Sequence, residues 1–165
     1  MQKGNVKLKP KPKGLDEAYV GKIIKAMSKV NVALYRATGG LVGSSWRVGS
    51  AFPFGIPVLL LTTTGRKSGQ PRTAPLLYIE DGDDIIVVAS QGGRPGDPLW
   101  YKNLQANPNA EVQIKRRKWK VKARTASPKE RERLWPMLVE HYNDFASYAT
   151  WTDRLIPVVV LEPVD

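Results

Sequence analysis

The chain has 165 residues and a hydrophobic content of 42%, which fits one domain with a sizeable core. Because it has no Cys and a single His, disulfide scaffolds, thiol catalysis and metal sites built from cysteines or several histidines are excluded, and we expect no metal. The formal net charge of +11 predicts an anionic partner, which would be a phosphorylated cofactor, an anionic lipid surface or nucleic acid.

The N-terminal region combines a basic tail with an amphipathic helix. Residues 1–14 are rich in Lys, Pro and Gly, which predicts a flexible tail. Apolar residues then recur with a period near 3.6, lysines occupy the other side, and Gly39-Gly40 provides a stop, so we expect a helix over residues 15–38. The helix packs on the domain or lies on an anionic membrane surface, and the sequence leaves both alternatives open.

Short strands dominate the rest of the chain. Residues 39–57 are rich in Gly, Ser and Pro and are predicted to form a loop. Apolar and β-branched runs between turn signals predict six strands, which are residues 58–64, 72–80, 85–90, 110–116, 119–125 and 156–161.

Two further helices separate these strands. One is predicted at residues 98–106 and the other from Pro128 to about His141, where Ser127 and Glu130 form a capping box. Pro136 is expected to kink or split the second helix.

This order of elements indicates the fold class. Strands follow one another too often for a doubly wound parallel sheet. We predict a mostly β (α+β) domain over residues 15–165, in which a small, mostly antiparallel barrel carries flanking helices.

The segment TTTGRKSGQPR, residues 62–72, is the first candidate site. Its glycines allow backbone N–H groups to approach an anion, and its three cations would neutralise a phosphate or carboxylate. It lacks the Walker A spacing, and a solvated basic turn is an equal alternative.

Aromatic side chains mark two further candidate regions. Residues 97–103 place Trp and Tyr at the start of a helix, and residues 90–93 end the preceding strand. We expect both regions to border one pocket, and the alternative is that Trp100 and Leu99 are simply core residues. An aromatic residue recurs every third position at Tyr142, Phe145, Tyr148 and Trp151. This spacing fits an aromatic wall that stacks on a flat ring system, and it also fits a row of ordinary core residues. The basic strand at 115–124 suits a nucleic-acid backbone, but no nucleic-acid-binding motif accompanies it, so we do not favour nucleic acid as the partner.

Taken in order, VLLLTTTGRKSGQPRTAPLLY, IIVVASQGG, DPLWYKNLQANP and YNDFASYATWTDRLIPVVVLEP resemble the deazaflavin-dependent nitroreductases and quinone reductases of actinobacteria. The resemblance covers about residues 15–165 and implies a split β-barrel like that of FMN-binding proteins. It implies coenzyme F420 as cofactor, since members of this family transfer hydride from the reduced 5-deazaflavin to quinones, nitroimidazoles and other activated acceptors. The cofactor-binding positions that it implies are Arg66, Lys67, Ser68, Arg72, Thr73, Ala74, Pro75, Leu76, Leu77, Val88, Ala89, Ser90, Gln91, Leu99, Trp100, Tyr101, Lys102, Asn103 and Phe145.

The resemblance also implies a catalytic role for the C-terminal aromatic cluster. Tyr142 and Tyr148 match the acceptor-lining tyrosines and are expected to supply a proton. Two positions depart from the family pattern: Phe145 stands where nitroreductases have a third Tyr, and Gln91 where relatives often have Lys. The first departure puts nitroimidazole reduction in doubt and leaves quinone reduction open.

Three questions stay open at this stage. FMN is the alternative cofactor on the same fold, and a non-enzymatic module that binds anionic lipid or nucleic acid is the alternative function. Because no apolar run could span a membrane and no signal peptide is present, we expect a cytoplasmic protein, which would contact the membrane peripherally through residues 1–38. A monomer and a homodimer are both compatible with the sequence.

Overall fold

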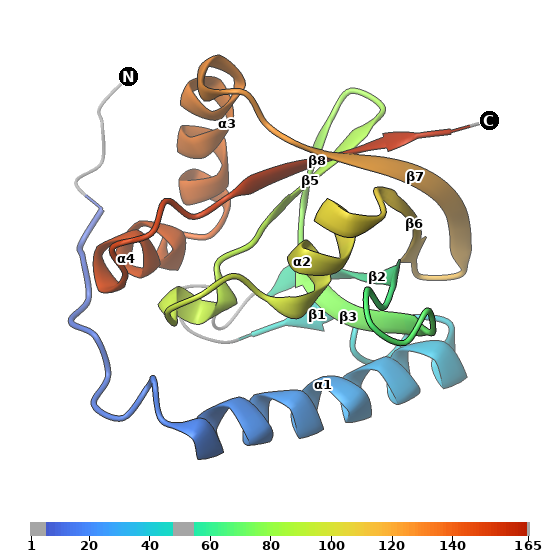
Figure 1. Cartoon of the computed structure of the whole chain (residues 1–165), viewed down its shortest axis with the longest axis horizontal. Helices are drawn as coiled ribbons and strands as arrows, with labels where there is room; N and C mark the ends of the chain where they lie inside the picture. The colour runs from blue at the N-terminus through green and yellow to red at the C-terminus, as the bar shows by residue number, and fades with distance from the viewer. Residues whose placement is uncertain (1–5, 48–54, 165) are drawn as a thin grey trace.

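Antiparallel strands curl into a half-open barrel in the computed structural model, which describes residues 6–47 and 55–164 (Figure 1). The described strands are β1 (Ser45–Trp46), β2 (Ile56–Thr64), β3 (Pro71–Leu77), β4 (Ile79–Asp81), β5 (Asp84–Val88), β6 (Asn109–Ile114), β7 (Arg117–Thr125) and β8 (Val158–Pro163). They pair in the order β1-β2-β6-β7-β8-β5-β4, and β3 also pairs with β2. The described helices are α1 (Ala18–Thr38), α2 (Leu99–Ala106), α3 (Pro128–His141) and α4 (Asp144–Trp151), with a 3-10 turn η2 (Gln91–Gly93). The predicted antiparallel barrel with flanking helices is confirmed.

The strand predicted at residues 72–80 is wrong in one respect, because the structure divides it at Tyr78. The first part, β3, pairs with β2, whereas the second part, β4, pairs with β5. The chain changes partners here as the barrel turns a corner, and side-chain periodicity does not report a change of partner. The predicted loop at 39–57 also contains β1 and the first residues of β2, and its residues 48–54 lie outside the described residues.

Helix α3 is a single helix that continues through Pro136, so the predicted split is wrong. Its capping box is confirmed: Ser127 Oγ accepts from the Glu130 N–H at 3.2 Å, and Glu130 Oε1 accepts from the Ser127 N–H at 3.1 Å. Arg124 donates two further bonds to the same carboxylate, and these lower the pKa of Glu130 to about 2.

Two hydrophobic clusters lie on opposite faces of the strands. The inner cluster fills the barrel and is closed by α2, and the outer cluster packs under α3 and α4. Strand β8 contributes side chains to both clusters. Val159 and Leu161 face the barrel, whereas Val158 and Val160 face the helices. Burial on both faces explains why this strand is a continuous apolar run and not an alternating one.

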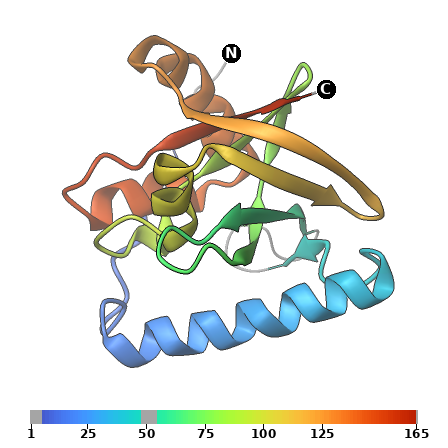
Figure 2. The same ribbon diagram turned by 45° about the vertical axis from the view of Figure 1, so that its right-hand side comes forward.

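Helix α1 runs along the outside of β3 and touches the barrel mainly near its C-terminal end (Figure 2). It begins at Ala18, three residues later than predicted. Tyr35 is its one buried residue, and the Tyr35 hydroxyl donates to the Val58 carbonyl at 3.1 Å and accepts from the Lys115 N–H at 2.7 Å. At the other end Arg94 Nε donates to the Leu15 carbonyl at 3.0 Å. Helix α1 is thus fixed at both ends and exposed between them.

Replacing Tyr35 by Phe is expected to weaken this attachment. The change leaves the Lys115 N–H and the Val58 carbonyl short of a partner, which costs about 1–3 kcal/mol of the free energy of unfolding. Urea denaturation followed by circular dichroism measures the loss. Tyr19→Phe is the matched control, because the Tyr19 side chain is exposed, and an equal effect of both variants would contradict the anchoring role of Tyr35.

The described part of the basic tail, residues 6–14, is an extended segment that lies against α4. The Lys9 N–H donates to Ser147 Oγ at 2.9 Å, and Trp151 Nε1 donates to the Lys9 carbonyl at 2.9 Å. The N-terminal segment and the last helix are therefore neighbours in space, although they lie at opposite ends of the chain (Figure 1).

Candidate functional site

The β2–β3 connection is a compact turn that projects a basic surface. The Gly65 N–H donates to the Gln70 carbonyl at 2.8 Å, and a Cβ at Gly65 would stand 2.7 Å from Ser68 Oγ and 3.1 Å from the Gln70 carbonyl oxygen, so a larger residue would displace the Ser68 hydroxyl. The turn is fixed to α2, because the Arg66 N–H donates to Asn103 Oδ1 at 3.1 Å and Asn103 Nδ2 donates to Thr63 Oγ1 at 3.1 Å.

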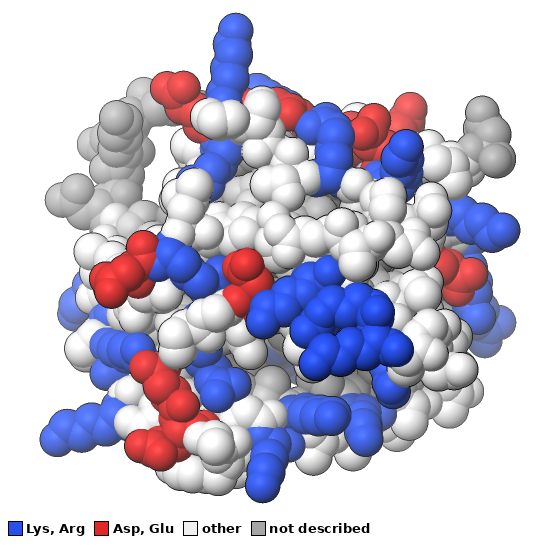
Figure 3. All heavy atoms as spheres, viewed as in Figure 1, with Lys and Arg blue, Asp and Glu red and all other residues white. Residues whose placement is uncertain are grey.

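The cations of this turn are free to meet a ligand. Arg66, Lys67 and Arg72 are exposed, and none of them forms an ion pair with an acid of the described residues. Arg72 Nη2 lies 3.4 Å from Ser68 Oγ, so the hydroxyl and the guanidinium face the same region. Figure 3 shows cations gathered over the β2–β3 connection, below α2. Such a cluster attracts phosphate and carboxylate groups.

The β3 positions predicted to contact a cofactor divide between two faces. Ala74 and Leu76 pack against the inner cluster and Leu77 against the outer one, while Pro75 is buried. Thr73 is half-buried, and its hydroxyl bonds Arg36 of α1 at 2.8 Å and Thr62 at 2.8 Å.

Helix α2 is largely a structural support. Trp100 and Tyr101 are buried in the inner cluster, and the Tyr101 hydroxyl bonds Thr125 Oγ1 at 2.8 Å. Lys102 is half-buried, and Leu99 is exposed. The alternative that Trp100 and Leu99 are simply core residues is therefore confirmed for Trp100 and wrong for Leu99.

The end of β5 leads into the second half of the site. The side chains of Val88 and Ala89 are buried in the core, and Ser90 is buried behind them. Gln91 has a positive φ of 48°, and its buried Oε1 has no hydrogen-bond partner within the described residues. An unpaired buried oxygen of this kind is costly unless a ligand or water donates to it.

Arg154 holds this loop, and sequence reasoning missed it. Its guanidinium donates to the carbonyls of Ala89 at 3.1 Å and Ser90 at 2.9 Å, and to Asp97 Oδ1 at 3.1 Å. Burial lowers the pKa of Arg154. No local pattern separates this Arg from the other 25 basic residues, because its partners lie about 60 positions earlier in the chain.

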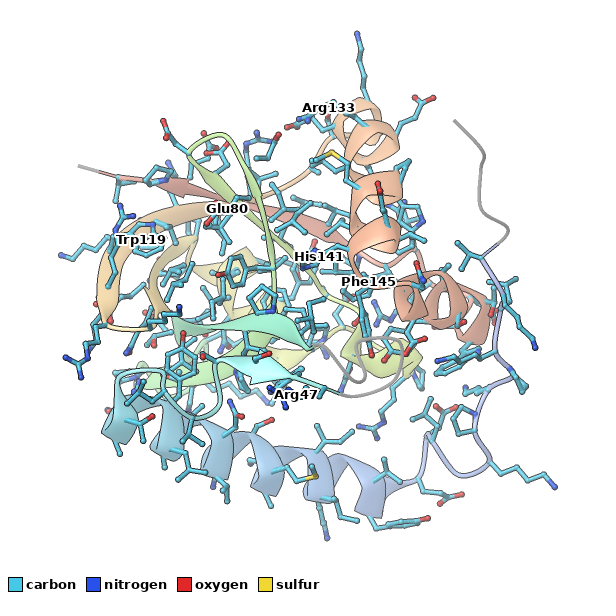
Figure 4. All side chains as sticks on the ribbon, turned by 180° about the vertical axis from the view of Figure 1, so that it is seen from behind. Arg47, Glu80, Trp119, Arg133, His141 and Phe145 are labelled. Carbon is cyan, nitrogen blue, oxygen red and sulfur yellow. The ribbon has the colours of Figure 1, made fainter. Side chains whose placement is uncertain are left out.

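The aromatic residues of α4 and the preceding turn form one contiguous cluster. Figure 4 shows one of them, Phe145, where α4 meets α3. Ring centroids are 5.1 Å apart for Tyr142 and Phe145, 6.2 Å for Phe145 and Tyr148, and 5.2 Å for Tyr148 and Trp151. Tyr142 and Phe145 are buried, whereas Tyr148 and Trp151 are partly exposed. The structure thus brings the predicted tyrosines together but leaves only Tyr148 at the surface.

The two tyrosine hydroxyls lie 3.2 Å apart. Burial raises the pKa of both, and for Tyr142 the bond to Tyr148 adds to the increase, whereas the same bond lowers the pKa of Tyr148. Either hydroxyl can be the donor in this bond. Tyr148 is the more exposed of the two, so its hydroxyl is the one that a bound acceptor could reach.

The aromatic cluster meets the β5 end at Gly93, the last residue of the predicted strand end at 90–93. A Cβ on Gly93 would lie 2.8 Å from Trp151 Cε3 and 3.0 Å from the Cα of Tyr148, so α4 is packed directly on η2. A hollow of about 410 Å³ lies beyond this junction, lined in part by Lys11, Gly96 and Trp151. Its lining includes none of the predicted cofactor-binding residues.

These residues fit an anionic flavin-like cofactor. Its acidic part matches the three unpaired cations, and the unpaired oxygen of Gln91 offers an acceptor at the other end of the site. Within the described residues no group of His, Cys, Asp and Glu could hold a metal ion.

Comparison with known proteins identifies the family of the chain. The family model for F420H(2)-dependent quinone reductase matches residues 27–163. A protein of Mycobacterium tuberculosis whose name places it among the F420H(2)-dependent quinone reductases is 48% identical over 117 residues, which are 71% of this chain and 98% of that protein.

Two solved structures extend the comparison. An F420-H2 dependent reductase is similar with a TM-score of 0.60 and 45% identity, covering 64% of this chain and 94% of that one, which agrees with the predicted split barrel. A chain described as a domain-swapped dimer has a TM-score of 0.62 and 35% identity, covering 87% of this chain and 99% of that one. The chain belongs to the F420H(2)-dependent quinone reductases, a family of oxidoreductases that use coenzyme F420.

Proposed function

We propose that the chain transfers hydride from reduced coenzyme F420 to a quinone-like acceptor. The observation that carries the proposal is that one chain combines three exposed cations of the β2–β3 region, which have no ion pair within the described residues, with the Tyr142–Tyr148 hydroxyl pair. Membership of the quinone reductase family supports the choice of acceptor.

Each part of the site has a role in this reaction. Arg66, Lys67 and Arg72, with Ser68, would bind the acidic part of the coenzyme, while the β3 strand and the backbone at the β5 end would border its ring. When bound, the coenzyme supplies the hydride, so the chain needs no nucleophile of its own. The aromatic cluster would hold the acceptor and exclude water, and Tyr148 would donate a proton to the reduced acceptor.

Phe145 stands where nitroreductases of the resembling family have a third tyrosine, and this difference bears on which acceptors the chain reduces. Phe145 is buried between Trp135 and the two tyrosines and carries no hydroxyl. We expect activity with quinones and little with nitroimidazoles.

Anaerobic turnover tests the proposal. The purified protein is mixed with reduced F420 and a short-chain quinone, and the absorbance of the oxidised deazaflavin is followed, with reduced FMN and a nitroimidazole as parallel conditions. Turnover with F420 and quinone is expected. Turnover with FMN alone would make the protein a flavin enzyme of the same fold, and turnover with neither would favour a non-enzymatic module that binds anions.

A peripheral membrane contact through α1 is a second proposal, since quinones of this kind dissolve in membranes. None of the described helices is long and apolar enough to cross a membrane. On α1, however, five exposed apolar residues recur at intervals of three or four, which are Tyr19, Ile23, Met27, Val30 and Leu34. Exposed lysines flank this stripe, as expected for a helix that lies on an anionic surface.

Replacing Ile23 and Met27 together by Ser is expected to lower binding to anionic vesicles about tenfold, because each side chain is exposed and would contribute apolar burial only on the membrane. Co-sedimentation with phosphatidylglycerol vesicles measures the binding. Leu155→Ser is the matched control, as its side chain is exposed away from α1. Unchanged binding would refute the membrane role, and a change of mass in solution would instead assign the stripe to a homodimer.

A further inference from the structure

Lys9 is held in place by more contacts than a lysine of a solvated tail would make. Its N–H donates to Ser147 Oγ at 2.9 Å, its carbonyl accepts from Trp151 Nε1 at 2.9 Å, and its Nζ lies 2.7 Å from Asp144 Oδ1. All three partners belong to α4, the helix that carries Tyr148. The segment therefore presents one charge at a defined point of the aromatic cluster.

That point is a buried carboxylate. The side chain of Asp144 is 9% exposed, against 50% for that of Lys9. Asp144 lies in the same turn as Tyr142 and Phe145, so its negative charge stands beside the hydroxyl pair. A buried carboxylate needs a partner, and Lys9 provides the cation.

We propose that Lys9 is a positioning residue of the active site, whose ammonium neutralises Asp144 and thereby allows Tyr148 to release its proton to the acceptor. The inference rests on the proposed function and extends it to the N-terminal segment. In the step concerned, the acceptor has gained two electrons with the hydride. The O–H bond of Tyr148 breaks and a new O–H bond forms on the acceptor, and the phenolate left behind later regains a proton from water.

Electrostatics supports the geometry. Asp144 raises the pKa of Tyr142 through its charge and a side-chain hydrogen bond, and its charge also raises the pKa of Tyr148. Lys9 lowers the pKa of Tyr148, opposing Asp144. Beyond the two tyrosines themselves, Asp144 and Lys9 are the charged groups that act on the pair, while His141 at the end of α3 has a pKa lowered by burial and is neutral at alkaline pH.

The proposal predicts a specific failure in the Lys9→Met variant. Removing the Lys9 ammonium from beside Asp144 should lower the rate of quinone reduction about tenfold and increase the solvent deuterium isotope effect, because proton release becomes slower. The affinity for F420, measured by fluorescence, should stay unchanged. The titration of Tyr148 can be followed by NMR of carbon-13-labelled tyrosine rings, with the Tyr148 signal assigned from its loss in Tyr148→Phe. In Lys9→Met this signal should titrate at higher pH than in the unaltered chain, even without cofactor. Lys9→Arg should restore all of these values, and Lys7→Met is the matched control, since Lys7 belongs to the same segment and is exposed.

A second background separates charge from mere attachment. In Asp144→Asn the charge to be neutralised is absent, so adding Lys9→Met should change neither the rate nor the titration of Tyr148. The proposal is overturned if Lys9→Met slows the enzyme equally in the unaltered chain and in Asp144→Asn. It is also overturned if Lys9→Met lowers the melting temperature without moving the titration of Tyr148, because the N-terminal segment then only stabilises the fold. If the unaltered chain shows no quinone reduction, the proposed function fails, while the titration of Tyr148 still tests the coupling by itself.

Discussion

Replacing Tyr148 by Phe is expected to lower the turnover of quinone reduction by about 100-fold, the lower end of the range for loss of a general acid. Tyr148 is the partly exposed member of the hydroxyl pair, and Tyr142, which is only 4% exposed, supports it from behind at 3.2 Å. Stopped-flow measurement of coenzyme oxidation at saturating acceptor reports this step.

Tyr142→Phe is the natural comparison. It removes the hydrogen-bond partner of the Tyr148 hydroxyl but leaves that hydroxyl itself, so its effect on turnover should be smaller, about tenfold. The coenzyme affinity of both variants should equal that of the unaltered chain. If neither variant slows turnover, the proton comes from solvent and the tyrosines only line the site.

Removing the charges of Lys67 and Arg72 together is expected to weaken F420 binding by at least about 100-fold. Both side chains are exposed without an acidic partner within the described residues, so their replacement breaks no ion pair there and removes only the long Arg72–Ser68 hydrogen bond. Each charge-assisted hydrogen bond to a ligand contributes about 1.5–3 kcal/mol, which corresponds to a factor of ten or more. Fluorescence titration of Lys67→Met/Arg72→Met with F420 measures the change.

A matched control comes from the other basic region. Lys118 and Lys120 lie on β7, are exposed and have no ion pair within the described residues, so their double replacement by Met alters the net charge equally. F420 binding by this control variant should fall only slightly, because only the general electrostatic field of the protein is weakened. In the Lys67→Met/Arg72→Met variant, the remaining F420 binding should depend less on salt than in the unaltered chain. Equal losses in the two variants would mean that net charge, and not the β2–β3 turn, attracts the coenzyme.

Several elements could be predicted because their signals are local. The capping box at Ser127 and Glu130 needs only four consecutive residues, and it forms as expected. The β6–β7 hairpin and the helix before Gly39-Gly40 are likewise defined by neighbouring residues. The strand divided at Tyr78 was missed because its two parts differ in partner and not in pattern.

The site shows the same division between local and distant information. The cations and glycines at residues 65–72 are adjacent in the chain, so their chemistry was visible in the sequence. Arg154, Gly93, Lys9 and Asp144 became relevant only through residues that lie far away along the chain, such as the loop at 89–97 for Arg154.

Periodicity, turn residues and local charge were enough to predict most helices and strands, the antiparallel barrel and the basic β2–β3 turn, because each depends on residues within a short stretch. The folded chain was needed to reveal helix α4, the contact of the N-terminal segment with it, the greater burial of Tyr142 than of Tyr148, and the exposure of the apolar stripe of α1. The physical reason is that burial and pairing depend on which distant segments come together, and an apolar residue has the same pattern whether its face is covered or not.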